Sequence, residues 1–335
     1  MNAQLMRRAL ALPAPLLRTL HRTAPIGAAV PPAARQLNLS HPSGWLAAAA
    51  ELQTYAGPHG EVHYERNGVT TFALGTEGVD ARALSDWSHA MRRQGARHTL
   101  LFPLALWQRP ALHACGFDTL IVGQEAEVYL PAYHCVGGAY ANLRHMLRRA
   151  HRNGLQAVVS GQLPGAAQAL ERPWRAGRAQ PERMRLLVGL HGACDRALFA
   201  VVSTRCGTPD AYVEARPGFN GRGYGVDGMV RAPGAPAGAM ELALNSLLEH
   251  RREAGDTWFS LGAVPLQGMD RSRPLLALIC RGLRETALGN ELFHFSGLQR
   301  FKAKFAPQWR PVLIGDYRRV GIRSLYEGCR LWGLF

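Results

Sequence analysis

The sequence contains very little lysine. Lys302 and Lys304 are the two lysines of the chain, so arginine supplies every other permanently charged basic side chain. The chain also lacks any run of 18 or more apolar residues, which excludes a membrane-spanning helix. Its six cysteines form no Cys-x-x-Cys pair, so neither a zinc site nor a disulfide framework is predicted. His59 and His63 alternate as in a strand beside a turn, and we expect no bound metal.

Acidic residues are absent from the first 50 positions, which carry five arginines among leucine, alanine and proline. Three interpretations stay open: a disordered leader, a basic segment lying on anionic lipid, and an organelle transit peptide. The prolines favour a disordered leader over residues 1–37. Because no long apolar core precedes a convincing cleavage site, we expect a cytoplasmic protein, peripheral on the inner face of the cell membrane.

The whole chain is strongly basic, with a formal net charge of +15 and an isoelectric point near 10.3. Such a charge predicts attraction to polyanions, namely nucleic acid or an anionic membrane face. The alternative is a solvated basic surface without a partner. Clustering of the basic residues favours a polyanion.

The first half of the chain alternates strands and helices. Asn67 and Gly68 join two alternating runs and predict a hairpin with a two-residue type I′ turn. Asp80 is placed to cap a helix that Gly95 terminates. Strands are expected over 98–104 and 118–130, with a short helix between them. This order predicts an α/β layer arrangement.

Residues 137–154 form a predicted helix with one apolar stripe and one cationic face. The cationic face has no acidic residue, whereas a solvated helix face normally mixes glutamate with arginine. An anion-binding helix is therefore favoured over a solvated face. Its arginines are Arg144, Arg148, Arg149 and Arg152.

The second half repeats the α/β order without visible repetition of residues. Strands are expected over 184–192, 197–205, from 211, 224–232, 257–266 and 311–318, and helices over 236–250 and 273–289. Gly218 to Gly225 resembles a phosphate cradle, but a strand follows it where a cofactor loop would open into a helix. We therefore expect no cofactor.

Three residues are candidates for chemistry. Asp227 lies among apolar residues on a predicted strand, where it pairs with Arg231, orients a substrate amine or helps to move a proton. Lys302 and Lys304 flank the stripe of Phe301 and Phe305, so at most one of them can point deeply into a cleft. An ammonium is a compact charge whose pKa shifts on burial, unlike a guanidinium. Chance retention of the two lysines is the alternative.

Several segments resemble the C-terminal catalytic domain of the phosphatidylglycerol lysyltransferase (multiple peptide resistance factor) family. The segments are FHFSGLQRFKAKFAPQWRPVLI (293–314), VDGMVRAPGAPAGAMELAL (226–244), GQEAEVYL (123–130) and WFSLGAVPL (258–266). The likeness covers about residues 38–318. It implies an α/β fold of two GNAT-like acyltransferase lobes, with mixed sheets flanked by helices and joined by a basic helix.

The resemblance also divides the chain. We expect an N-terminal lobe over 38–136, a basic connecting helix over 137–154, a linker over 155–183 and a C-terminal catalytic lobe over 184–335. The membrane-embedded flippase half that is common in the family is not represented in the sequence, so no lipid translocation is expected of this chain.

The implied activity is transfer of an aminoacyl group from aminoacyl-tRNA to the hydroxyl of an anionic phospholipid such as phosphatidylglycerol. It assigns Asp227, Lys302 and Lys304 to catalysis. Substrate binding is assigned to Arg231, Arg300 and Phe301. The tRNA acceptor stem is assigned to Arg144, Arg148, Arg149 and Arg152. One departure is Val230, which stands where the family has arginine.

Two other functions stay open. One is a transferase of the same fold that acts on a soluble small-molecule acceptor or uses an acyl-coenzyme A donor. The other is a non-catalytic basic RNA-binding protein with a degenerate site, an interpretation that Val230 supports.

Overall fold

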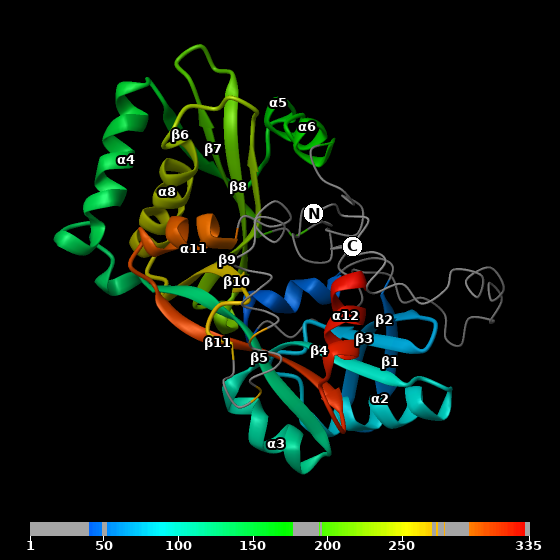
Figure 1. Cartoon of the computed structure of the whole chain (residues 1–335). Helices are drawn as coiled ribbons and strands as arrows, with labels where there is room; N and C mark the ends of the chain where they lie inside the picture. The colour runs from blue at the N-terminus through cyan, green and yellow to red at the C-terminus, as the bar shows by residue number, and fades with distance from the viewer. Residues whose placement is uncertain are drawn as a thin grey trace.

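The computed structural model describes residues 40–48, 52–176, 194, 196–269, 273, 278 and 295–331. The described part is built on one sheet of eleven strands in the order β1-β2-β3-β4-β11-β5-β10-β9-β8-β7-β6. Figure 1 shows helices on both sides of this twisted sheet. The predicted mixed α/β class is confirmed, but the two predicted sheets are joined into one.

The N-terminal half of the sheet contains β1 (Gln53–Gly57), β2 (Gly60–Asn67), β3 (Thr70–Leu74), β4 (His98–Ala105) and β5 (Phe117–Tyr129). The C-terminal half contains β6 (Gln156–Ser160), β7 (Leu198–Ser203), β8 (Pro209–Gly218), β9 (Gly223–Arg231) and β10 (Trp258–Pro265). The last strand is β11 (Gln308–Tyr317). The strands predicted over 98–104 and 118–130 are thereby confirmed, whereas 184–192 lies outside the described residues.

The longer helices are α2 (Ala81–Arg93), α4 (Ala141–Arg152), α8 (Ala239–Glu253), α11 (Phe295–Ala303) and α12 (Ile322–Leu331). Short helices are η3 (Pro42–Ala48), η4 (Leu106–Gln108), α3 (Arg109–Ala114), η5 (Leu130–Ala132), η6 (Gly138–Tyr140), α5 (Gly165–Gln168), α6 (Glu171–Ala176) and η7 (Phe219–Gly221). Within the described ranges, none of the helices combines the length and apolar character needed to cross a bilayer.

Local signals in the first half are confirmed, with one shift. β2 and β3 form the expected hairpin, but Asn67 pairs with Thr70, so the turn residues are Gly68 and Val69. Gly68 alone takes a positive φ, of 60°, which fits a turn whose first central residue is left-handed and corrects the type I′ prediction. The Asp80 side chain accepts from the Arg82 backbone N–H at 2.8 Å and so begins α2 as predicted.

The C-terminal strand corrects the predicted division of the chain. β11 does not extend the C-terminal half; it pairs antiparallel with β4 on one side and β5 on the other. Strand pairing depends on apolar pattern and on distant partners, which local sequence does not specify. The N-terminal half is therefore completed by residues from the far end of the chain.

The predicted linker over 155–183 is also corrected in part. Residues 156–160 form β6, which pairs antiparallel with β7 at the edge of the sheet. Helices α5 and α6 follow and pack against β8 and β9. The apolar residues Val158 and Val159 are too few for a strong strand signal, so the pattern favoured a linker.

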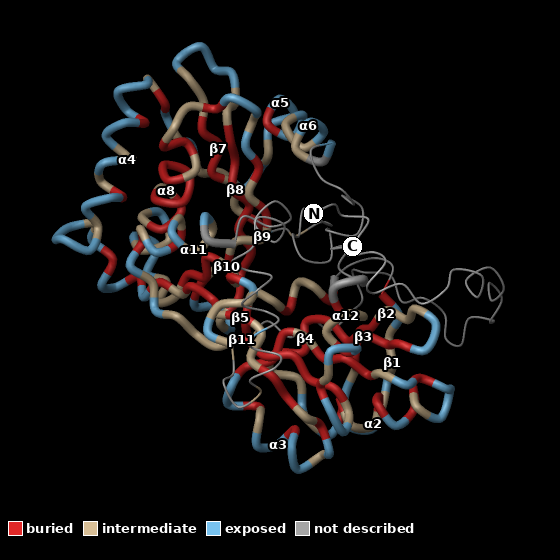
Figure 2. The backbone as a smooth tube through the Cα atoms, viewed as in Figure 1, coloured by how far each residue is buried: buried red, intermediate tan, exposed pale blue. Residues whose placement is uncertain are grey.

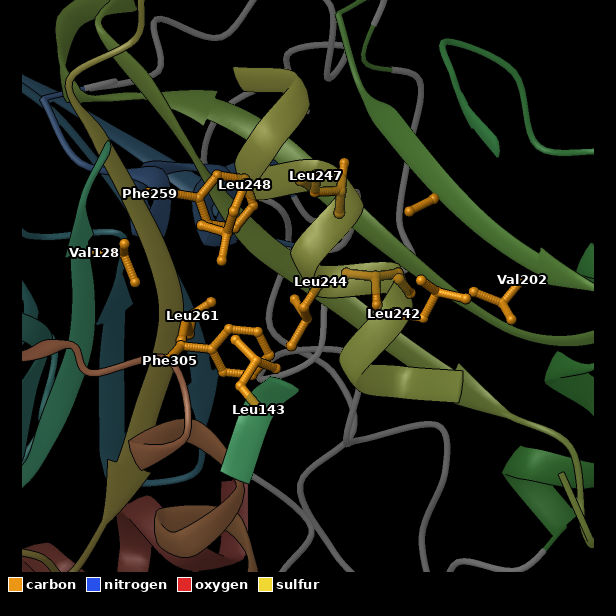
Figure 3. Close-up of a cluster of buried hydrophobic side chains, with 14 of the residues drawn as sticks. Val128, Leu143, Val202, Leu242, Leu244, Leu247, Leu248, Phe259, Leu261 and Phe305 are labelled. Atoms are coloured by element: carbon orange, nitrogen blue, oxygen red, sulfur yellow. The ribbon is translucent and has the colours of Figure 1, made fainter. Parts of the chain in front are cut away.

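Two apolar cores share one face of the sheet, and Figure 2 shows buried residues in red along its strands. Helix α8 packs there through Leu244, Leu247 and Leu248 against Phe259 and Phe305, as Figure 3 shows. Helices α2 and α3 cover the N-terminal half of the same face. Trp309 packs with the α8 core and Leu313 with the α2–α3 core, and side chains four residues apart on β11 point to one face of the sheet. The opposite face carries η3 and α12.

Candidate active site

The face under η3 holds a cluster of charged side chains, here called the β5–β11 cluster. His41, Glu77 and Glu125 are buried, and Glu127 and Arg310 are half-buried. The Arg310 guanidinium lies 3.0 Å from Glu77 Oε1, 2.5 Å from Glu125 Oε2 and 2.7 Å from Glu127 Oε1. His41 Nε2 lies 3.3 Å from Glu125 Oε1 and 3.3 Å from Glu127 Oε1. One guanidinium and one imidazole thus face three carboxyl groups.

The electrostatics of this cluster follow from its pairing. Burial alone would lower the pKa of His41, but the charges of Glu125 and Glu77 outweigh it and raise that pKa to about 10. Burial would raise the pKa of Glu125, yet His41 and Arg310 hold it well below its usual value. Burial dominates at Glu77, whose pKa is raised. The imidazolium and the guanidinium therefore stabilise Glu125 as an anion.

A bulge in β10 lies beside this cluster. Ser260 pairs with Glu127 and Ala263 with Glu125, so β10 has one extra residue between them, and Gly262 takes a φ of 82°. Ser260 Oγ donates a short hydrogen bond to Glu125 Oε1 and accepts from the Gly262 backbone N–H at 2.9 Å. The bulge is therefore tied to the charged cluster by a serine hydroxyl.

Lys302 reaches the same bulge from α11. Its Nζ donates to the Ala263 carbonyl at 2.9 Å, and the residue is 3% exposed. Burial lowers the pKa of Lys302 to about 7, against a smaller opposing effect of Glu125. Both the amine and the ammonium are consequently present near neutral pH.

Lys304 has a different environment. Its Nζ lies 2.6 Å from Glu241 Oε1 on α8 and 5.5 Å from the Phe301 ring centroid. Phe305 is fully buried and Phe301 packs against the same core, as expected from their spacing. The two lysines therefore diverge, and Lys302 is the deeply placed one.

A second charged group, here called the β8–β9 cluster, consists of Glu214, Arg216 and Asp227. Arg216 Nε lies 2.5 Å from Asp227 Oδ2, and Arg216 Nη2 lies 2.9 Å from Glu214 Oε1. The register of β8 and β9 shifts between Glu214 and Ala215, which leaves Asp227 as the extra residue of a bulge. Burial raises the pKa of Asp227 to about 7, although Arg216 acts in the opposite direction.

This pairing corrects the predicted partner of Asp227. Arg216 of the neighbouring strand holds the carboxyl group, while Arg231 is exposed at the end of β9. Val230 is fully buried against Val201 and Tyr212, so the position where the resemblance expects arginine is part of an apolar cluster. The bulge causes both results, because it changes which side chains of β9 share a face.

The segment 40–48 joins the two clusters. His41 belongs to the β5–β11 cluster, and the Trp45 ring lies 5.3 Å from the Arg216 guanidinium carbon. Trp45 Nε1 donates to the Pro217 carbonyl at 2.7 Å. A Cβ at Gly218 or Gly225 would lie 2.5 Å from Pro42. The glycine run therefore permits close packing of this segment.

Sequence reasoning missed most of these ionic residues. Glu125 and Glu127 alternate with Ala126 and Val128, a pattern that places both carboxyl groups on one face of a strand. That alternation was a usable signal. His41, Glu77, Arg216 and Arg310 gave no signal, because distant strands and loops bring them together.

The predicted basic helix is confirmed as α4, with Leu143 and Ala150 buried. Arg148, Arg149 and Arg152 are exposed. Arg144 is half-buried and donates to the carbonyls of Cys135 at 3.2 Å and Gly137 at 2.7 Å. Arg300 is exposed on α11. The structure therefore leaves three arginines of α4 facing solvent and uses the fourth to hold a loop.

One group among the described residues has ligand atoms close enough for a metal ion. His41, Glu125 and Glu127 each offer an atom, all within 4.8 Å of one another. Arg310 already contacts both carboxylates at 2.5 and 2.7 Å. A divalent ion would have to displace this guanidinium, so the donor set fits an internal ion pair better than a metal.

Comparison with known proteins identifies the family. A family model described as phosphatidylglycerol lysyltransferase, C-terminal, matches residues 24–314. The chain belongs to this family. The resemblance found in the sequence motifs is thereby confirmed, and the chain has a phosphatidylglycerol lysyltransferase-like catalytic domain.

Two solved structures have a similar fold. L-PGS from Bacillus licheniformis is 20% identical with a TM-score of 0.65, over 89% of this chain and 92% of that chain. The C-terminal domain of a lysylphosphatidylglycerol synthetase candidate from Agrobacterium fabrum is 21% identical with a TM-score of 0.63, over 88% of this chain and 93% of that chain. At these identities the likeness establishes the fold.

One curated relative is the lysylphosphatidylglycerol biosynthesis bifunctional protein LysX from Gordonia bronchialis. It is 26% identical over 234 residues, which cover 64% of this chain. The match spans 20% of the length of that relative. The similarity therefore concerns one part of a much longer protein.

Proposed function

We propose that this chain transfers an aminoacyl group from aminoacyl-tRNA to the hydroxyl of an anionic phospholipid such as phosphatidylglycerol. Membership of the family supports this activity. The observation that carries it is Lys302, a buried amine at the β10 bulge whose pKa of about 7 suits proton transfer near neutral pH. We also infer that each half of the sheet derives from one GNAT-like lobe.

The reaction is a transesterification. The lipid hydroxyl loses its proton to the neutral amine of Lys302 as its oxygen bonds to the ester carbonyl carbon. The bond to the tRNA ribose oxygen then breaks, and this oxygen takes the proton from the Lys302 ammonium. The ammonium also lies near the developing oxyanion, where a positive charge lowers the barrier.

The aminoacyl amine fits the β8–β9 cluster. Glu214 and Asp227 share the single guanidinium of Arg216, so one carboxyl group has no cation of its own within the cluster. A substrate ammonium would supply it. Lysine is the first amino acid to test, because the name of the curated relative refers to lysylphosphatidylglycerol.

The donor tRNA fits the exposed arginines of α4. Arg148, Arg149 and Arg152 lie within one and a half turns of each other, and the helix carries no acidic residue. Phosphate contacts by arginine release counterions, so the affinity for tRNA should fall steeply with salt. With a lipid acceptor, we place the chain peripherally on the inner face of the cell membrane.

The deciding experiment incubates the purified protein with labelled lysyl-tRNA and phosphatidylglycerol vesicles and measures labelled lipid. Wild type is expected to form aminoacyl-lipid. Lys302→Met is expected to lower the rate by about 10²-fold or more, as for loss of a general base. Cys206→Ser, an exposed position outside both clusters, is the matched control and should retain the wild-type rate.

Two outcomes would favour the other functions. Discharge of tRNA without labelled lipid would indicate a soluble acceptor. Binding of tRNA without any discharge, tested with a pool of charged tRNAs, would indicate a non-catalytic RNA-binding protein.

A further inference from the structure

We propose that the chain docks on an anionic lipid bilayer through an apolar knob at the start of α3, made of Leu106, Trp107, Pro110 and Ala111. All four residues are exposed. Trp107 is 68% exposed and Leu106 is 45% exposed. The inference rests on the proposed function in taking a lipid as the acceptor, and vesicle binding tests it without turnover.

The knob is held rigidly from below. Gln108 is buried, accepts from the Ala105 backbone N–H at 3.0 Å and donates to the Thr76 carbonyl at 3.1 Å. Leu112, on the next turn, is fully buried in the α2–α3 core. Ala105 and Gln108, which flank Leu106 and Trp107 in the chain, are thus both buried. The exposure of Leu106 and Trp107 is built into the fold, and adjacent exposed large apolar side chains mark an interaction site.

Arginines flank the knob at the other end of α3. The Arg318 backbone N–H donates to the carbonyl of Gly116, just after α3, at 2.9 Å. The guanidinium carbons of Arg318 and Arg92 lie 5.7 Å and 5.0 Å from the Tyr317 ring centroid. Arg93 is exposed nearby on α2. A helix of six residues is about 9 Å long, so these charges lie close to the knob.

Arg93 and Arg318 are exposed to an anionic surface, and Arg92 is half-buried with Nη1 donating to the Arg97 carbonyl at 3.2 Å. Within the described residues, neither Arg92, Arg93 nor Arg318 forms an ion pair with a carboxylate. Each basic residue near an anionic leaflet contributes about 1 kcal/mol to binding. An apolar group with tryptophan beside cationic residues is the pattern of an interfacial membrane contact. Figure 1 shows α2 and α3 next to each other, away from α4, which leaves the proposed tRNA surface free.

The position of the knob agrees with a lipid acceptor. Gln108 binds the carbonyl of Thr76, and the next residue, Glu77, belongs to the β5–β11 cluster. A bilayer docked on the knob would bring lipid headgroups to the loop that borders this cluster. An RNA partner would gain little from Leu106, and a protein partner would need a buried area of about 1,000 Å² or more, larger than these four side chains offer.

The test measures binding of the full chain to vesicles by flotation. Wild type should bind phosphatidylglycerol-containing vesicles more tightly than phosphatidylcholine vesicles. The double variant Leu106→Ser and Trp107→Ser should bind about tenfold or more weakly, because two apolar side chains no longer leave water. Val158→Ser is the matched control, since Val158 is 66% exposed on β6 at the far edge of the sheet.

Equal vesicle binding by the folded double variant and wild type would overturn the proposal. So would a wild-type dimer that the double variant converts to a monomer in sedimentation velocity, since a second copy would then cover the knob. Vesicle binding that depends on Trp107 without any aminoacyl-lipid product would leave this inference standing and remove the proposed function.

A second readout follows the Trp107 side chain itself. Brominated phosphatidylglycerol should quench part of the wild-type tryptophan fluorescence. Trp107→Phe keeps an apolar ring and removes the indole, so the quenched part should be lost while vesicle affinity changes less than in the double variant. Undiminished quenching in Trp107→Phe would place this side chain outside the bilayer.

Discussion

The β5–β11 and β8–β9 clusters lie on the same sheet face but balance their charges differently. In the first, Arg310 contacts three carboxyl groups and His41 adds a second cation, so the pKa of Glu125 is held below its usual value. In the second, Arg216 is the one cation that contacts Glu214 and Asp227 among the described residues, and burial raises the pKa of both acids. Both clusters have one more carboxyl group than cations, and burial raises the pKa of Glu77 in the first as well. The difference is that Glu125 faces two cations whereas Asp227 faces one.

The difference has a consequence for binding. In the first cluster His41 and Arg310 each lie near all three carboxyl groups, and removing one of these cations leaves unpaired buried charge. In the second cluster one guanidinium faces two acids, so the cluster can take up either a proton or a cationic group from a substrate. The first arrangement suits a structural frame around the β10 bulge, and the second suits recognition of an ammonium.

The largest expected effect comes from removing the Arg310 guanidinium from the β5–β11 cluster. Arg310→Met leaves three carboxyl groups, two of them buried, with His41 as their partner in the cluster, and we expect a loss of about 3–5 kcal/mol in the free energy of unfolding at pH 7. Urea denaturation measures it. Arg205→Met, at an exposed position, is the control and should change stability by less than about 0.5 kcal/mol. A loss as small as the control's would mean that solvent screens the cluster.

The second prediction concerns the pH dependence of the β8–β9 cluster. The pKa of Asp227 is raised from 3.8 to about 7 in the folded state, so the folded chain holds a proton that the unfolded chain releases between these values. Stability should therefore fall as the pH rises from about 4 to about 7. Asp227→Asn should remove up to about 3 kcal/mol of this fall. Thermal unfolding of both proteins across this range measures it.

Local sequence signals predicted the helix α4 and the hairpin of β2 and β3 because their evidence lies within a few residues. The apolar stripe of α4 repeats at helical spacing, and Gly68 supplies the positive φ of the turn. Burial of one of the two lysines could also be predicted from nearby residues, because Phe301 and Phe305 fix the orientation of α11. The resemblance of short motifs then gave the family.

The ionic site could not be predicted in the same way, because its parts come from distant segments. Arg310 is 185 residues from Glu125, and His41 is 269 residues from Arg310. The insertion of β11 between β4 and β5 brings them together, and that pairing has no local signal. Asp227 was correctly singled out as an isolated carboxylate, but the bulge that gives it Arg216 as a partner depends on β8.

A third, smaller effect separates the role of Lys302 in stability from its role in chemistry. Its pKa is lowered from 10.5 to about 7 in the folded state, so wild-type stability should rise as the pH rises from about 7 to about 10.5. Lys302→Met should lack this rise and be about 1 kcal/mol more stable than wild type at pH 7, since burying an ammonium is costly. Denaturant midpoints at several pH values measure it. A variant that is less stable and equally pH-dependent would contradict the buried amine.

The smallest expected effect concerns the segment 40–48, which packs against the β8–β9 cluster through Trp45. Trp45 lies over Arg216 in the β8–β9 cluster and donates to the Pro217 carbonyl at 2.7 Å. Trp45→Phe keeps an aromatic ring over the guanidinium but removes this donor, so we expect a loss of about 1 kcal/mol in the free energy of unfolding. Trp45→Leu should cost more, because the cation–π contact is lost as well. If both variants were as stable as wild type, the segment 40–48 would not stabilise Arg216. The position of the Arg216 guanidinium would then depend on Glu214 and Asp227 alone.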